Sequence, residues 1–411
     1  MLWTAWAVER GDAQRREAVL LVTGEAPELA PRTPVVVNLL LDRSGSMKGA
    51  PLAAAVEAAS QLVDLCGPED FAGLLVFDGV AEQLVPVGAM DTVGKRKMHD
   101  ALQSIAIGRG TALHEAVKLG AGQLSRLLVP GRRPKLLLLT DGEPSVGPED
   151  QRSFDRLGHQ LAEDGLSLHA LGLARHYVPE ILSALTLPSG NGFAHVDAPD
   201  GLSVAMGELC AHLFGEASSA VSVRVMPQGF SALACRHAFP TKVENDALVV
   251  SLGDIARGAP RRVLFGGPLA GAEWGATVLG SCVERGDSRV QRVELEHVAA
   301  DSYRGRSVRA AELELELVSQ EAAAWLSLAR KNVTRAEEQL LAAEGALREL
   351  VMLAVELKNV PVRRHLERLG DLRLAVERGE GDFPLLIRRA MSAKAGAHIS
   401  QVIPLHAARK K

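Results

Sequence analysis

Short, wholly apolar runs alternate with helix-like segments through the middle of the chain, between residues 34 and 214. Runs of this kind are typical of strands buried on both faces, as in a parallel sheet. The segments between them carry apolar residues at three- and four-residue steps, which indicates amphipathic helices. This alternation predicts an α/β fold, a doubly wound, mostly parallel sheet with helices on both faces. The runs that predict the strands are Val35–Leu41, Phe71–Phe77, Lys135–Thr140 and Leu166–Leu171.

The two flanks of this region follow a different pattern. Before and after it, short alternating segments are separated by Gly, Pro and Asp, which predicts the strands of a β-sandwich. Two of these predicted strands are Val290–Glu296 and Ala311–Val318. Beyond them the spacing becomes helical, with a last short helix expected after Pro384. The predicted domains are therefore an α/β domain at 33–214, a β-sandwich formed by 1–32 and 215–320, and a C-terminal α-helical region at 321–411.

Charge and cysteine content narrow the class of function. The 411 residues carry 46 Lys and Arg against 50 Asp and Glu, a net charge of −4, which disfavours a general nucleic-acid binder. The four cysteines form no C-x-x-C pair, so reduced thiols are expected in place of a disulfide framework or a zinc ribbon. The first residues lack the basic start of a signal peptide, and no apolar run approaches the ~20 residues that span a bilayer. We therefore expect a cytoplasmic protein without a membrane span.

Oxygen-bearing side chains follow two of the predicted buried strands. Asp42, Ser44 and Ser46 come directly after the first strand, and Asp141 follows a later one. Thr111 lies in a glycine-containing loop that precedes a helix. Ligands of open α/β sheets bind beyond the carboxyl ends of the strands, so these five side chains are expected at one rim. Two carboxylates and three hydroxyls, without His or Cys, suit a hard cation, Mg²⁺ above all, with Mn²⁺ or Ca²⁺ as alternatives.

The spacing of these residues is similar to that of a known family. Asp-x-Ser-x-Ser after a buried strand, a distant Gly-x-Gly-Thr and Thr-Asp-Gly after another buried strand resemble the metal-ion-dependent adhesion site of the von Willebrand factor A family. The resemblance covers the middle domain. It implies that Ser44, Ser46 and Thr111 contact a metal ion, whereas Asp42 and Asp141 act directly or through water. A Glu or Asp of a protein partner would then complete the coordination of the metal.

The resemblance has one departure and one extension. The Asn that commonly follows the threonine is Ala112 here, which costs little because that position is not a metal ligand. The flanks are similar to bacterial and plant intracellular proteins that join such a domain to a β-sandwich and terminal helices. Val250–Ile255, followed by Arg261–Phe265, carries this second similarity. It implies that 1–32 pairs with later strands of the sandwich, so that the α/β domain is inserted between them.

The leading hypothesis is a Mg²⁺-dependent protein-interaction module, an adaptor or scaffold of the intracellular bacterial type and not an enzyme. A Mg²⁺-dependent phosphohydrolase is one alternative, but such enzymes show Asp-x-Asp after the first strand, and Ser44 occupies the second position here. Another alternative makes the chain an adaptor of a AAA+ ATPase or of a kinase–phosphatase signalling set. Near the rim, Arg43, Lys48 and Arg109 are either solvated or favour an acidic partner. Glu143 is either a solvated loop acid or a competing internal ligand.

Overall fold

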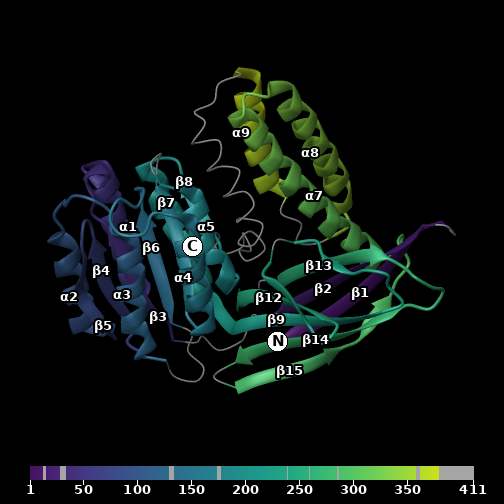
Figure 1. Ribbon diagram of the computed structural model, residues 1–411, viewed down its shortest axis with the longest axis horizontal. Coiled ribbons are helices and arrows are strands. Elements are labelled where there is room, and N and C mark those ends of the chain that lie inside the picture. The colour runs from purple at the N-terminus through teal and green to yellow at the C-terminus, as the bar shows by residue number, and fades with distance from the viewer. Residues whose placement is uncertain are drawn as a thin grey trace. The chain divides into compact units, whose positions relative to one another are not determined.

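The structure, a computed structural model, divides the chain into two units. The α/β unit takes in the middle of the chain up to Ser219, together with Val283–Asp287. The sandwich–helix unit takes in the N-terminal segment, Ala220–Cys282 and the described chain from Ser288 onward (Figure 1). The residues that the structure describes are 1–12, 15–27, 34–128, 134–173, 177–237, 239–258, 260–284, 287–357 and 362–378.

The α/β unit is built on a six-stranded sheet in the order β5-β4-β3-β6-β7-β8. Only β5 runs antiparallel to its neighbour, and every other pair in this sheet is parallel. The predicted doubly wound, mostly parallel sheet is therefore confirmed. Its strands are β3 (Val36–Asp42), β4 (Phe71–Phe77), β5 (Ala81–Ala89), β6 (Lys135–Thr140), β7 (Ser167–Leu173) and β8 (Phe193–Val196).

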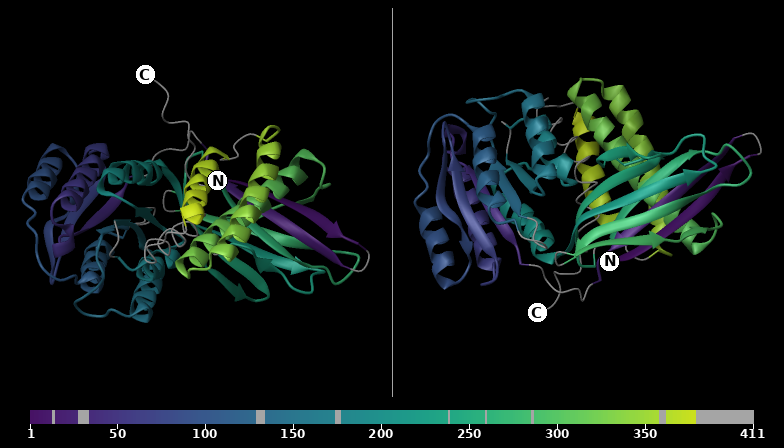
Figure 2. Two further views of the ribbon diagram at one scale, coloured as in Figure 1. Left: turned by 90° about the horizontal axis from the view of Figure 1, so that it is seen from above. Right: turned by 60° about the horizontal axis from the view of Figure 1, so that its bottom comes forward.

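Helices cover both faces of this sheet because its strands are apolar on both faces. Val37, Leu39 and Leu41 of β3 share one buried core with α1, α2 and α6. Leu40, which points the other way, contacts α3, where a Cβ on Gly120 would lie 3.1 Å from it. The left view of Figure 2, which looks at the molecule from above, shows helices on either side of the strands of this sheet. The helices are α1 (Ala50–Leu65), α2 (Thr92–Gln103), α3 (Leu113–Ser125), α4 (Gln151–Glu163), α5 (Pro179–Thr186) and α6 (Leu202–Gly215).

Two five-stranded sheets form the sandwich, in the orders β10-β13-β2-β1-β16 and β11-β12-β9-β14-β15. The ring of Trp3 in the first sheet lies 2.3 Å from the place where a Cβ of Gly280 in the second would be, so glycine is required for this close approach. Leu21 of β2 is opposite Leu264 of β13, which puts segments from before and after the α/β unit in one sheet. The strands are β1 (Leu2–Gly11), β2 (Arg16–Glu25), β9 (Glu216–Gln228), β10 (Ala234–Cys235), β11 (Thr241–Glu244), β12 (Ala247–Ala256), β13 (Pro260–Pro268), β14 (Gly275–Glu284), β15 (Asp287–Val293) and β16 (Leu295–His297).

One predicted strand of the sandwich is wrong: Ala311–Val318 lies inside the helix α7 (Tyr303–Ala329). The alternation of Glu and Leu predicted a strand on the assumption that every Glu faces water. In the structure Glu314 is buried and pairs with Arg262 at 3.0 Å, so it belongs to the buried side of a helix. The helical region consequently begins at Tyr303 and not at 321. With α8 (Val333–Ala354) and α9 (Val362–Arg378) it forms its own buried cluster.

A second difference concerns Val290–Glu296, which was predicted as a single strand. The chain instead leaves β15 at Val293, and β16 starts at Leu295 in the other sheet, where it pairs with β1. The predicted last helix after Pro384 falls outside the described residues. Among the helices of the described ranges, none is both long and apolar enough to cross a membrane.

Candidate metal centre

The candidate centre lies at the carboxyl ends of β3 and β6. The strands that follow β3, namely β4 and β5, lie on one side of it in the sheet. The chain then crosses over, and β6 lies on the other side of β3. Such a reversal of strand order opens a crevice between the loops, where open α/β sheets bind ligands. Asp42 ends β3, and the loop behind it forms a short 3₁₀ turn, Gly45–Met47. The fully buried Met47 side chain anchors this turn in the core, which fixes the hydroxyls of the loop.

Hydrogen bonds join the serines of the first loop to the aspartate of the third. The Ser46 hydroxyl donates to Asp141 Oδ1 at 2.7 Å. The hydroxyls of Ser44 and Ser46 are 3.1 Å apart, and because Ser46 has already donated its only proton, Ser44 is the donor of this bond. Asp141 and Ser44 are buried, whereas Ser46 is exposed at the mouth of the site. The two loops therefore present their oxygens as one connected group.

Gly142 marks the point on which three of the oxygens converge. A Cβ on this glycine would lie 3.3 Å from Asp42 Oδ2, 3.3 Å from Thr111 Oγ1 and 3.5 Å from Ser44 Oγ. Oxygens from the loop after β3 and from the Thr111 loop thus surround a space on a third loop, which a side chain at Gly142 would enter. The adjoining cavity has a volume of about 360 Å³. Its lining is Ser44, Gly45, Ser46, Gly110, Thr111, Gly142, Glu143 and Ser145.

Asp42 is a fully buried carboxylate whose hydrogen-bond donors among the described residues are uncharged. Its Oδ1 accepts a hydrogen bond from the Ser44 amide at 2.8 Å, and its Oδ2 accepts one from the Thr140 hydroxyl at 2.6 Å. Burial raises the pKa of Asp42 to about 6; the Thr140 and Ser44 hydrogen bonds oppose this rise, and the nearby charge of Asp141 adds to it. A buried carboxylate in this position favours a cation, which would offset the cost of keeping its charge away from water.

The loop that carries Thr111 is held by its neighbours. The Thr111 amide donates to Ser145 Oγ at 3.0 Å, and the Ser145 amide donates back to the Thr111 carbonyl at 3.1 Å. On the other side, the Ala112 amide donates to the Asp78 carbonyl, and the Gly108 amide donates to the Arg43 carbonyl at 2.8 Å. Although Ala112 replaces the common Asn, these hydrogen bonds of the backbone hold the loop in place.

The structure brings all five of the predicted side chains to one rim. Sequence reasoning missed the neighbours that hold them: Thr140, which orients Asp42; Ser145, which orients Thr111; and Gly142, which leaves the central space open. Thr140 and Gly142 flank Asp141 in the motif, but only the structure shows which way they point. In the described part of the chain, no group of three or more His, Cys, Asp or Glu side chains is arranged to hold a metal ion, and the candidate centre itself relies on hydroxyls beside its two carboxylates. The donor set, two carboxylates and three hydroxyls around an open space, fits a hard divalent cation.

We expect Thr140→Val to weaken divalent-cation binding by about 10- to 100-fold, because valine keeps the shape but removes the donor that orients Asp42. Without this donor the pKa of Asp42 should rise further above its usual value. The two effects are measured by titrating Mn²⁺ into the protein and by repeating the titration from pH 5 to 8. Ser104→Val, at an exposed position after α2, serves as the control. Equal Mn²⁺ affinity in wild type and Thr140→Val would show that Thr140 does not support the site.

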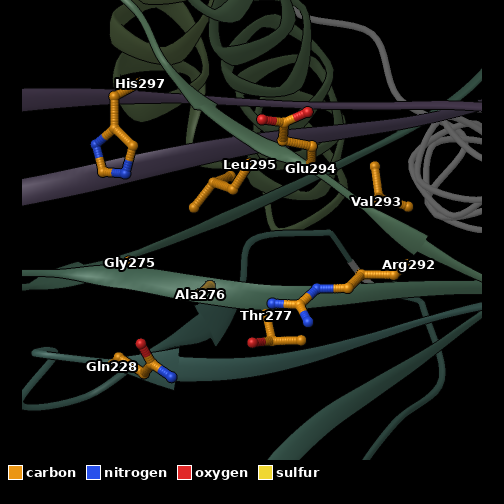
Figure 3. A pocket seen from close by; sticks show the side chains of 9 residues that line it. All are labelled: Gln228, Gly275, Ala276, Thr277, Arg292, Val293, Glu294, Leu295 and His297. Carbon is orange, nitrogen blue, oxygen red and sulfur yellow. The ribbon is translucent and has the colours of Figure 1, made fainter.

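Two other cavities have a different character. One, of about 550 Å³, lies where the chain passes from β15 to β16, and Figure 3 shows its polar side chains spread around the space without converging on one point. The other, also about 550 Å³, is a mainly apolar groove between α8 and α9, with Leu347 and Leu369 on its floor and Met352 at its edge. Neither combines buried charge with converging oxygens as the rim of the α/β unit does.

Comparison with known proteins identifies the α/β unit. Residues 37–143 match the family model of the von Willebrand factor type A domain. Human inter-alpha-trypsin inhibitor heavy chain H4 is 29% identical over 174 residues, which cover 40% of this chain and 18% of that protein. An uncharacterized protein of Synechocystis sp. is 27% identical over 188 residues, 45% of this chain and 43% of that protein. The chain thus matches less than half the length of these curated relatives.

Solved structures resemble a larger part of the chain. A von Willebrand factor type A protein from Catenulispora acidiphila has a TM-score of 0.65 at 16% identity, covering 90% of this chain and 89% of that one. The ArnB paralog VWA2 from Sulfolobus acidocaldarius has a TM-score of 0.55 at 16% identity, covering 96% and 97%. At such identities the likeness shows the fold alone. The matched residues and the shared fold agree: this chain contains a von Willebrand factor type A domain.

Proposed function

We propose that the α/β unit binds Mg²⁺ at this rim and uses it to hold an acidic residue of a protein partner. The observation that carries the proposal is the convergence of the Asp42, Ser44 and Thr111 oxygens on the open space at Gly142, together with the burial of the Asp42 carboxylate. The residues that would hold the ion are Asp42, Ser44, Ser46, Thr111 and Asp141. Domains of this family generally mediate protein–protein interaction, and some members carry a metal in this motif, which also supports the proposal.

The charges of the rim side chains leave room for an external carboxylate. Two aspartates supply two negative charges and the three hydroxyls supply none, so these side chains at most balance the 2+ of the ion and add no surplus negative charge that would repel a further carboxylate. Thr140 and the Ser44 amide hold Asp42 in place, and Ser145 holds the Thr111 loop. When bound, the ion would supply a positive centre with room for one more oxygen ligand. Mn²⁺ has the same preference for oxygen ligands and, with Ca²⁺, is the alternative ion.

We propose a binding module and not an enzyme. In a metal-dependent phosphohydrolase a second acid would stand two positions after Asp42, and the residue there, Ser44, has its hydroxyl hydrogen-bonded to Ser46. The module is proposed to act in a cytoplasm of the bacterial type, in keeping with the reduced thiols of all four cysteines. An adaptor role beside a AAA+ ATPase or a kinase–phosphatase set is compatible with the same site.

The test is a co-purification with the full chain as bait, in Mg²⁺ and in EDTA. We expect partner proteins to be retained in Mg²⁺ and lost in EDTA, and lost equally when the bait is Asp141→Ala. Asp100→Ala, which removes a largely exposed carboxylate of α2, is the matched control and should retain them. If the same proteins remain bound in EDTA and to Asp141→Ala, the metal has no part in the interaction.

A further inference from the structure

Of the three basic residues near the rim, Lys48 and Arg109 are exposed, whereas Arg43 is already paired with acids. Arg43 lies between two of the site residues, but its guanidinium is turned to Asp78, at 3.5 Å, and to Glu82, at 3.1 Å. Two carboxylates therefore share its charge, and Arg43 ties the first loop to the end of β4. An arginine paired in this way adds little attraction for a strongly acidic partner.

A negative charge stands on the wall of the cavity itself. Glu143 directly follows Gly142, is exposed, and lines the same cavity as Ser44 and Thr111. A partner that brings one carboxylate to the metal can keep clear of this residue. A partner with a run of acids would place further negative charges beside it, which costs free energy because like charges repel at short range. The wall thus discriminates against acidic clusters.

Beside Gly110 the rim carries apolar groups, because the loops that contain Gly79, Gly110 and Val146 meet there. A Cβ on Gly110, which lines the cavity, would lie 3.2 Å from Val146 Cγ2 and 3.3 Å from the Cα of Gly79. The amides of Ser145 and Val146 both donate to the Thr111 carbonyl, at 3.1 and 3.4 Å, which fixes Val146 beside the site.

More apolar surface lies on the other two of these loops. Val146 is 39% exposed, and the exposed Val80 and Ile107 stand next in sequence to Gly79 and Gly108. Each of the loops that meet at Gly110 therefore has one exposed aliphatic side chain. Covering such side chains on binding is favourable in proportion to the apolar area removed from water.

We propose that the partner segment presents a single Glu or Asp with an apolar residue beside it, and that Val146 and Glu143 select this pattern. The inference rests on the proposed function and names the class of partner that its site accepts. Val146 contributes by contact with the apolar side chain, whereas Glu143 contributes by rejecting further acids. Both are specificity residues, and neither belongs to the set that would hold the ion.

Three capped peptides test the proposal on the full chain saturated with Mn²⁺: Gly-Glu-Leu, Gly-Glu-Gly and Glu-Glu-Glu. Binding is followed by the water-proton relaxation of the bound Mn²⁺, which falls when a carboxylate replaces water. We expect Gly-Glu-Leu to bind about fivefold more tightly than either of the others. Val146→Ser should remove its advantage over Gly-Glu-Gly. Glu143→Gln should improve the binding of Glu-Glu-Glu about threefold relative to Gly-Glu-Leu.

Val204→Ser is the matched control, since Val204 is a well-exposed valine on α6. It should leave the order of the three peptides unchanged. Equal affinity for all three peptides in the wild type, or an undiminished preference for leucine in Val146→Ser, would overturn the inference while leaving the metal site intact. If no peptide changes the water-proton relaxation of bound Mn²⁺, or if Mn²⁺ itself does not bind, both the proposed function and this inference are wrong.

Discussion

Replacing Asp42 by asparagine is expected to abolish divalent-cation binding and yet to stabilise the metal-free protein at neutral pH. Burial raises the pKa of Asp42 to about 6 in the folded protein, from 3.8 for an ordinary aspartate. The folded state therefore binds the proton more tightly than the unfolded chain. The free energy of unfolding is therefore expected to fall by about 3 kcal/mol as the pH rises from about 4 to above 6. Asparagine carries no charge, so Asp42→Asn should not show this loss.

Thermal unfolding with and without Mg²⁺ measures both effects. In EDTA at pH 7.5 we expect Asp42→Asn to unfold several degrees above wild type, and the difference to shrink toward pH 4. Mg²⁺ at 100 times its dissociation constant should stabilise wild type by about 2.7 kcal/mol and leave Asp42→Asn unchanged. Asp100→Asn, a neutralised surface acid, is the control. A variant that is less stable than wild type in EDTA at pH 7.5 would contradict the view that Asp42 holds an uncompensated charge.

The second large effect is expected from Gly142→Ala, which adds one methyl group at the centre of the site. The new Cβ would stand 3.3 Å from oxygens of Asp42 and Thr111 and 3.5 Å from that of Ser44. It would fill the space on which these oxygens converge, so we expect Mg²⁺ and Mn²⁺ affinity to fall by about 100-fold or more. The φ angle of Gly142 is not positive, so alanine adopts this backbone without strain and the fold should persist.

Gly45→Ala provides the matched control for this variant. Gly45 lines the same cavity, but a Cβ there would meet nothing within 4 Å, and its φ is likewise not positive. Calorimetric titration with Mg²⁺ should therefore give wild-type affinity for Gly45→Ala and no measurable binding for Gly142→Ala. Equal affinity in the two variants would mean that the ion, if it binds, does so elsewhere.

The α/β unit could be predicted from the sequence because its strands are buried on both faces. Val35–Leu41 and Lys135–Thr140 are nearly unbroken apolar runs, and few structures other than a covered parallel sheet bury such runs. The site was predictable for a related reason: carboxyl ends of parallel strands meet at one edge, so Asp42 and Asp141 had to come close once both strands were assigned. The position of Thr111 at this edge was predicted from its motif and from its place in the loop before α3.

The errors arose where a contact distant in sequence decides the structure. Glu314 looked like the outward residue of a strand, because its partner Arg262 lies on β13, about 50 residues earlier in the chain. Arg43 looked like a free cation at the rim, because its partners Asp78, directly after β4, and Glu82, on β5, lie more than 30 residues away in the sequence. In each case an ion pair with a residue distant in sequence decides where the side chain lies, and such a pair can be seen only in three dimensions.

A titration of Mn²⁺ into the full chain, with the free ion followed by electron paramagnetic resonance, tests the central claim most directly. We expect one Mn²⁺ per chain, displaced by Mg²⁺, and loss of this binding in Thr111→Val, which removes one hydroxyl at nearly constant shape. Thr4→Val, at an exposed position of β1, should bind as wild type does. If wild type takes up no Mn²⁺, or if Thr111→Val binds it with unchanged affinity, the oxygens gathered around Gly142 do not form a metal site.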